Sequence, residues 1–341
     1  MKNIIKQREI VSLLFVVVLF IMVGFFNPKF LAVNNIFQII NSSSIYVLVA
    51  LGMGFVLFIG EIDVSVGATL GFSAAIAAKL VNSGMSIPLI FLIVALFGAV
   101  IGIINAIGVV GFEIPSIIMT LGTMGIIRGA IYIYTGGIWL QNFPKNFMQI
   151  TQNTLAGTFT ILFIVLILLT VLLYLFTKFT LFGKSFKAVG DNIDGARLIG
   201  IPVKRVKVSS FIICGVFAAV AGVLYASRVG FVTPMDGNGY EMTAIAACVI
   251  GGINLIGGEG TPFGAMIGAI LMSSLSSILV FLGFPSTYNN TITGVILIAI
   301  VVVGAITNQR AAEKLRKLRL LARVSEKPDA VPESNIAQKG E

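Results

Sequence analysis

Long apolar segments recur along almost the whole chain and constrain its fold more than any other feature. They run for about twenty residues, the length that an α-helix needs to cross the hydrocarbon core of a bilayer. Of the 341 residues, 57% are hydrophobic and only 11% are charged, whereas about a quarter of the residues of a soluble domain are charged. A membrane β-barrel would show alternating segments of about ten residues instead. The sequence therefore predicts an all-α polytopic membrane protein.

About ten transmembrane helices are expected, some of them short or broken. We place them near residues 10–26, 45–59, 64–81, 86–111, 113–137, 159–176, 208–226, 242–256, 261–282 and 291–306. Residues 30–44 are only mildly apolar and carry regularly spaced amides, so this segment is expected at the membrane interface. Residues 139–153 form a polar outer loop with the only Trp, which suits a membrane–water boundary. The transmembrane domain as a whole spans 10–307.

Lys and Arg gather in three segments: 1–9, 178–207 and 308–341. Such clusters stay on the cytoplasmic side of a membrane, so we expect a cytoplasmic N-terminus, central loop and C-terminal tail, the tail being disordered at its end. The net charge of +9 follows from this orientation and is not a sign of nucleic-acid binding. The chain has no His, which excludes His-ligated metals and His-based acid–base catalysis.

The central loop contains the signals of a short helix within GKSFKAVGDNIDGARLIGIPVKRVK, residues 183–207. Three residues could cap its start: Asp191, Asn192 and Asp194. Gly200 can adopt the left-handed conformation that closes a last turn, and Pro202 prevents continuation.

One face of this predicted helix is apolar, because Ile193, Ala196 and Ile199 recur at helical spacing while Arg197 points elsewhere. Gly195 in mid-helix costs about 1 kcal/mol relative to Ala, which suggests close approach of another backbone. A short helix of this kind is suited to being held by a partner protein. The alternative is an ordinary solvated connection.

No nucleotide-binding loop is found. Gly183-Lys184-Ser185 resembles the end of one, but the required earlier glycine is replaced by Lys178. Any ATP that drives this protein must therefore be hydrolysed by a partner.

Two breaks in the apolar pattern resemble each other. IGEIDVSVG, residues 59–67, and IGGINLIGG, residues 250–258, match at four of nine positions, either as a remnant repeat or by chance. Glu61 and Asp63 in the first break could lie in water at a turn, or the broken helices could line a path. Asn254 lies in the second break.

Arg128 is a basic residue inside the fifth predicted span. It is a functional candidate by its position in the membrane, although snorkelling or a structural pair with a carboxylate is an equal alternative. The candidate path residues are thus Glu61, Asp63, Arg128 and Asn254. Glycine pairs at i and i+4 predict close helix packing at Gly98/Gly102, Gly125/Gly129 and Gly260/Gly264/Gly268.

The segments VGDNIDGARLIGIPVKRVK, AVAGVLYASRVG and GYEMTAIAACVIGGINLIGGEGTPFGAMIGA closely resemble the permease subunit of bacterial ABC importers for monosaccharides, the ribose/galactose/xylose class. IGEIDVSVGATLGF is similar to that family's GGIDLSVG segment, with Glu61 where Gly is usual. The resemblance covers nearly the whole chain and implies the larger, type II-like importer fold.

The resemblance also implies the partners. The permease would work as a homodimer or related heterodimer in the bacterial cytoplasmic (inner) membrane, with a cytoplasmic ABC ATPase that binds ATP-Mg and an extracytoplasmic sugar-binding protein. The chain itself would hold no cofactor and would not be an enzyme. The residues implied to form the ATPase-coupling helix are Gly190, Asp191, Asn192, Asp194, Gly195, Ala196, Arg197 and Gly200.

The expected substrate is a small sugar. Related permeases carry autoinducer-2, nucleosides or branched-chain amino acids, so these remain alternatives. An ion-coupled secondary transporter is a further alternative, but it would need carboxylates inside the membrane, and Glu61, Asp63, Glu113 and Glu259 are all expected at span ends.

Overall fold

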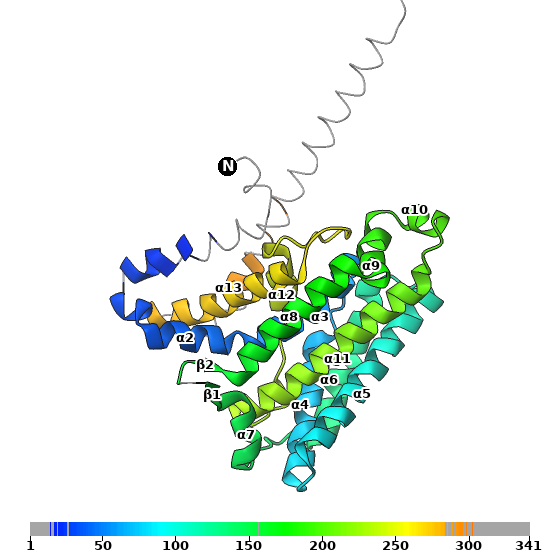
Figure 1. Ribbon diagram of the computed structural model, residues 1–341. Helices are drawn as coiled ribbons and strands as arrows, with labels where there is room; N and C mark the ends of the chain where they lie inside the picture. The colour runs from blue at the N-terminus through cyan, green and yellow to red at the C-terminus, as the bar shows by residue number, and fades with distance from the viewer. Residues whose placement is uncertain are drawn as a thin grey trace, which may run out of the picture. The chain divides into compact units, whose positions relative to one another are not determined.

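The computed structural model describes residues 27–155 and 157–283, together with residues 14, 17, 18, 20–25, 285, 288, 291–295, 298 and 302. The chain divides into two units, Met1–Gly294 and Val295–Glu341, and every labelled helix and strand lies in the first. Its described residues are helical apart from the loops and one two-stranded hairpin (Figure 1). This confirms the predicted all-α class. The predicted terminal segments 1–9 and 308–341 lie outside the described residues, as do parts of the first and tenth spans.

The described residues of this unit contain no second sheet. In chain order the elements are η1 Pro28–Leu31, α2 Val33–Ser42, α3 Ser44–Phe58, α4 Val66–Asn82, α5 Ile87–Ala106, the π-helical turn η2 Ile107–Gly111, α6 Ser116–Thr135, α7 Lys145–Gln152, β1 Thr154–Leu155, β2 Phe159–Thr160, α8 Ile161–Phe179, α9 Leu181–Asp191, α10 Ile193–Leu198, α11 Val203–Val229, α12 Tyr240–Ile250 and α13 Pro262–Phe281.

Six helical segments among the described residues are long and apolar enough to cross a membrane. They are Val33–Phe58, Ile87–Gly111, Ser116–Thr135, Ile161–Phe179, Val203–Val229 and Pro262–Leu279. The apolar helices α4 and α12 are shorter. The eight predicted spans between residues 45 and 282 each correspond to one of these helices, so the predicted series of long and short spans is confirmed.

Two predicted bounds are wrong. The seventh span was placed from residue 208, but α11 begins at Val203, directly after Pro202. Lys204, Arg205 and Lys207 therefore belong to its first turns, which long basic side chains permit because they can extend toward water. The eighth span was placed to residue 256, but α12 ends at Ile250, where Gly252 has φ of +89° and the chain turns.

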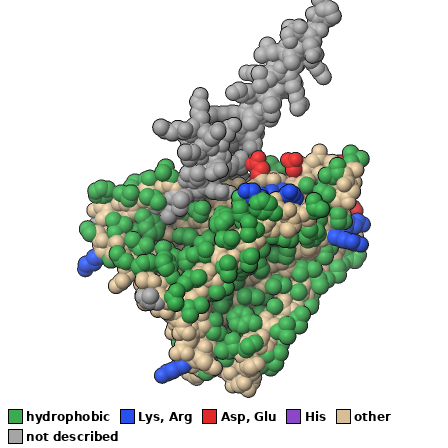
Figure 2. All heavy atoms as spheres, in the orientation of Figure 1, with side chains coloured by type: hydrophobic (Ala, Val, Ile, Leu, Met, Phe, Trp, Pro, Cys, Tyr) green, Lys and Arg blue, Asp and Glu red, His purple; other side chains and the backbone are tan. Residues whose placement is uncertain are grey.

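Different connecting segments lie at the two ends of the helix bundle. At the basic end, α8 stops and α11 begins, and α9 and α10 connect them (Figure 1). At the far end α11 stops at Val229, next to α7, and Leu140 pairs with Val232 as an isolated β-bridge. On the face drawn in Figure 2, hydrophobic side chains cover the helices while charged ones lie at its margins, as expected of a surface in contact with lipid.

Helix α11 packs against α3, α4 and α5 and forms the centre of the unit. Close approach depends on glycine: Gly98 and Gly102 of α5 face the backbone of α11 at Gly215 and Phe211. A Cβ at Gly98 would overlap with the carbonyl oxygen of Gly215. The predicted close packing at Gly98/Gly102 is therefore confirmed.

The other glycine pairs behave differently from one another. Gly264 and Gly268 of α13 face Gly251 and Ala247, so their close packing is also confirmed. In contrast, a Cβ at Gly125 or at any other glycine of α6 would meet no atom within 4 Å. The same sequence pattern thus lies in tight contacts on two helices and faces open space on the third.

We predict that Gly98→Ala lowers the thermal stability of the purified protein, because overpacking a close helix contact costs about 1–3 kcal/mol. The matched control is Gly129→Ala on α6, where the new methyl group has space and helix propensity improves by up to about 1 kcal/mol. Thermal unfolding of both variants in detergent checks the prediction. Equal midpoints for the two variants would contradict the packing described here.

Candidate coupling and translocation sites

The short helix predicted in the central loop is present as α10. Its cap is Asn192, whose Oδ1 accepts a hydrogen bond from the Gly195 N–H at 2.9 Å. Gly200 follows the helix with φ of +79°, as its predicted closing role requires. Asp191 instead ends the preceding helix α9, and Asp194 lies in the first turn of α10.

The exposed face of α10 differs from the predicted apolar stripe. Ala196 is buried within the chain at 3% exposure, and Ile193 is half-buried. The large apolar side chains that face outward are Leu198, 88% exposed, and Ile199, 74% exposed. Arg197 pairs with Asp194 at 3.3 Å on the surface, where such ion pairs contribute little stability.

Gly195 contacts its own helix cap. A Cβ at this position would lie 3.2 Å from Cγ of Asn192. The tight space at Gly195 therefore reflects the capping side chain inside this chain, and it gives no separate sign of a partner backbone.

Just before α10, the chain passes through a junction of three segments. A Cβ at Gly190 would overlap with the carbonyl oxygen of Phe58, which also accepts a hydrogen bond from Gly258 N–H at 3.0 Å. A Cβ at Gly257 would overlap with the backbone N of Gly60 and with Cα of Gly190. We call this contact of Gly60, Gly190 and Gly257 the glycine junction. It brings the two breaks of similar sequence against each other and against the end of α9.

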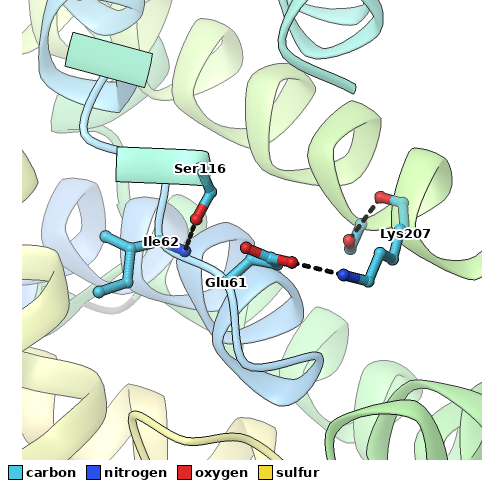
Figure 3. A network of polar contacts seen from close by, with 5 residues as sticks. Glu61, Ile62, Ser116 and Lys207 are labelled. Carbon is cyan, nitrogen blue, oxygen red and sulfur yellow. Dashed lines mark hydrogen bonds and ion pairs between the residues drawn. The ribbon is translucent and has the colours of Figure 1, made fainter. Parts of the chain in front are cut away.

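The first break is also held by side chains from two other helices. Lys207 of α11 forms an ion pair with Glu61, and Oγ of Ser116 in α6 accepts a hydrogen bond from the Ile62 N–H at 3.2 Å (Figure 3). Thr120 accepts one from the Val64 N–H at 3.0 Å. These bonds satisfy the non-helical backbone, which irregular structure within a helix bundle requires. Glu61 is thus a paired residue and not a carboxylate in open water.

Asp63 lies in the first break, just before α4, and is only 1% exposed. Its carboxylate accepts hydrogen bonds from the N–H and the hydroxyl of Ser65, at 2.9 and 2.6 Å, and from Asn105 at 3.3 Å. Burial raises the pKa of this carboxyl above its ordinary value, although these hydrogen bonds act in the opposite direction. A carboxylate at a helix start is also favoured by the helix dipole. The geometry favours a structural role in the turn.

Arg128 lies in α6 and reaches the loop between α11 and α12. Its Nη1 donates to the backbone oxygen of Asp236 at 2.6 Å, while its buried Nη2 has no hydrogen-bond partner. The negative charges of Glu241 and Asp236 attract its positive guanidinium. Arg128 therefore ties a loop to α6, within reach of buried negative charge.

Glu241 is the residue that sequence reasoning missed. It lies in the first turn of α12 and is 6% exposed, with Oε1 accepting from the Gly239 N–H at 3.1 Å and Oε2 unpaired. The helix was predicted from residue 242, which left Glu241 outside it. Asp63 lies at a span end, as expected, but it is buried, and Glu241 is a second buried carboxylate that the sequence analysis did not consider. Reading GYEMTAIAA as the start of the helix would have revealed a carboxylate in an apolar segment.

The four predicted path residues do not form one site. Asn254 makes a local turn, its Oδ1 accepting from the Ile256 N–H at 3.2 Å. The loop of Asn254 meets the break that holds Glu61 and Asp63 at the glycine junction. The side chains of Asp63 and Arg128, however, bind separate partners. Among the residues that the structure describes, no group of three or more Cys, Asp or Glu is arranged to hold a metal ion.

Comparison with known proteins identifies the class of this bundle. A family model described as branched-chain amino acid transport system / permease component matches residues 35–301. The chain belongs to this permease family. It is therefore the non-catalytic permease subunit of a binding-protein-dependent ABC importer, a multi-pass protein of the bacterial inner membrane, and a partner ATPase handles ATP.

Curated relatives cover almost the whole permease. It is 36% identical over 335 residues to the autoinducer 2 import system permease protein LsrC of Escherichia coli (strain K12 / DH10B), covering 98% of both chains. The LsrC protein of Shigella flexneri matches to the same extent. That of Salmonella typhi is 38% identical over 302 residues, 89% of this chain and 87% of the relative. No solved structure matches.

These findings confirm the predicted ABC permease class and the absence of an enzymatic role. The monosaccharide class receives less support than the autoinducer-2 alternative, because the relatives above are autoinducer-2 permeases. An ion-coupled secondary transporter does not agree with the family to which the permease belongs.

We predict that Arg128→Ala lowers the yield of folded permease, because removing a cation that interacts with a buried carboxylate is strongly destabilising. Adding Glu241→Gln should recover most of the loss, since the amide needs no compensating charge. Size-exclusion chromatography of the detergent-solubilised variants measures the folded fraction. If Arg128→Ala folds like the parent but loses uptake, Arg128 instead lines the path.

Proposed function

We propose that this permease forms the membrane path of an ATP-driven importer for autoinducer-2. The observation that supports the proposal is its likeness to LsrC proteins over 98% of both chains. The sugar substrate expected from the sequence remains the second candidate, because the family-typical segments at residues 60–72 and 189–268 also resemble sugar permeases.

We expect cells that express the permease with its own ATPase and binding protein to take up autoinducer-2 in a saturable manner. Excess ribose or leucine should compete weakly. The measurement is depletion of autoinducer-2 from the medium, with cells lacking only this chain as the control. Uptake of ribose or leucine without uptake of autoinducer-2 would overturn the assignment.

The proposed orientation has the basic end in the cytoplasm, with both termini on the same side. Its support is the concentration of Lys and Arg in residues 178–207 and in the terminal segments. In this orientation the far end, with α7 and the β1–β2 hairpin, receives solute from the extracytoplasmic binding protein. A second permease subunit, identical or related, completes the transporter in the bilayer.

We further propose that α9 and α10 couple the permease to the ATPase. Leu198 and Ile199 offer an exposed apolar contact of the kind that helix-in-groove docking uses. Ala196 and the glycine junction attach this contact rigidly to the bundle. A push on α10 is thereby passed to both broken segments, and through Lys207 and Glu61 to α11.

Leu198→Asp should leave the permease folded but weaken its association with the ATPase by at least about tenfold, equivalent to about 1.4 kcal/mol. The matched control is Leu155→Asp, another exposed leucine, which lies in β1 at the far end. Co-purification of the ATPase and solute-dependent ATP hydrolysis provide the readout. Equal behaviour of the two variants would refute the coupling assignment.

A further inference from the structure

A polar and aromatic cavity of about 460 Å³ lies beside the last turn of α11, near the far end, between α2, α3, α11, α12 and α13. Its volume lies in the range of about 300–1,000 Å³ that is usual for small-molecule sites. We propose that this cavity is a transient binding site for a small, uncharged, polyhydroxylated ring. The inference rests on the proposed import of such a solute.

Three tyrosines provide flat walls for a ring. The Tyr46 and Tyr240 rings stack at 4.9 Å with an interplanar angle of 8°, and Tyr225 meets Tyr240 edge-on at 6.0 Å. Aromatic faces carry partial negative charge and attract the positively polarised C–H groups of a ring, while phenolic hydroxyls can donate or accept hydrogen bonds. The cavity therefore offers both kinds of contact that a hydroxylated ring needs.

One face of α2 supplies the polar wall. Asn35, Gln38 and Ser42 line the cavity and are spaced so that they share a side of the helix. The sequence placed this amide-rich segment at the membrane interface. In the structure these side chains line a cavity, and Gln38 also lines a second cavity beside it, of about 540 Å³.

Arg228 belongs to both cavities and closes the polar wall. Its Nη1 donates to the Asn41 backbone oxygen at 3.1 Å and its Nη2 to Ser42 Oγ at 2.8 Å. A guanidinium has five N–H donors, so these two bonds leave donors for oxygen atoms of a solute. Because Gln38 and Arg228 line both cavities, the two lie side by side along α2.

The charges of the lining select against amino acids. Among the described residues that line the first cavity there is one cation, Arg228, and no carboxylate. The ammonium group of an amino acid would lose water there without gaining an opposite charge, which is costly. An uncharged, oxygen-rich solute does not meet this cost.

Cysteine protection tests the site directly. Ser276→Cys places a thiol in the cavity wall, while the native Cys214 and Cys248 are buried and do not compete. We expect autoinducer-2 to slow modification by a small methanethiosulfonate reagent at least about fivefold, close to 1 kcal/mol of protection, and leucine to leave the rate unchanged. The control is Ser83→Cys, exposed at the far end, whose labelling neither solute should affect.

Filling the cavity gives a second readout. Ser277→Phe should reduce uptake at least about tenfold, whereas Leu275→Phe, which adds volume on α13 outside the cavity lining, should retain it. If autoinducer-2 does not slow methanethiosulfonate labelling of the Ser276→Cys variant, and this variant still imports autoinducer-2, the inference is overturned while the proposed function stands. If ribose is imported and protects instead, the substrate assignment fails and the cavity site remains.

Discussion

Close backbone contact at the glycine junction is the constraint on which the basic end of the permease depends. Phe58 O, Gly60, Gly190 and Gly257 approach so closely that a Cβ on any of the three glycines would overlap with a neighbouring backbone. Gly60 and Gly257 also have positive φ, +76° and +97°, which other residues rarely adopt. The junction allows the two broken segments and the end of α9 to meet where side chains would hold them apart. It thereby links the proposed coupling helix to both broken segments without an intervening flexible loop.

Glycine also makes room for buried charged groups. Gly67 and Gly71 of α4 make room for the loop that carries Asp236 and for the Glu241 carboxylate. Arg128 then supplies the cation that buried carboxylates require. The loop between α11 and α12 therefore holds Arg128 in place and packs against α4, which makes that loop a structural element of the membrane core.

The two ends of the permease perform separate tasks in the proposed transport cycle. The basic end presents Leu198 and Ile199 outward on a rigid support. The far end contains the cavity lined by tyrosines and by the polar face of α2. Helices α3 and α11 run between these ends, since both contribute to the cavity and contact α9. Motion of the proposed coupling helix would therefore reach the proposed solute site through helices that pack against each other.

Local chemistry by itself determined the membrane class, the order of the spans and the capped helix α10, because apolar length, Asn192, Gly200 and Pro202 act through their immediate neighbours in the chain. It could not separate Gly98/Gly102, which pack tightly, from Gly125/Gly129, which face open space. It also missed Glu241 and misjudged Ala196, whose burial depends on segments distant in sequence. Only the tertiary structure decided these points, since close packing and desolvation are set by whichever backbone lies opposite.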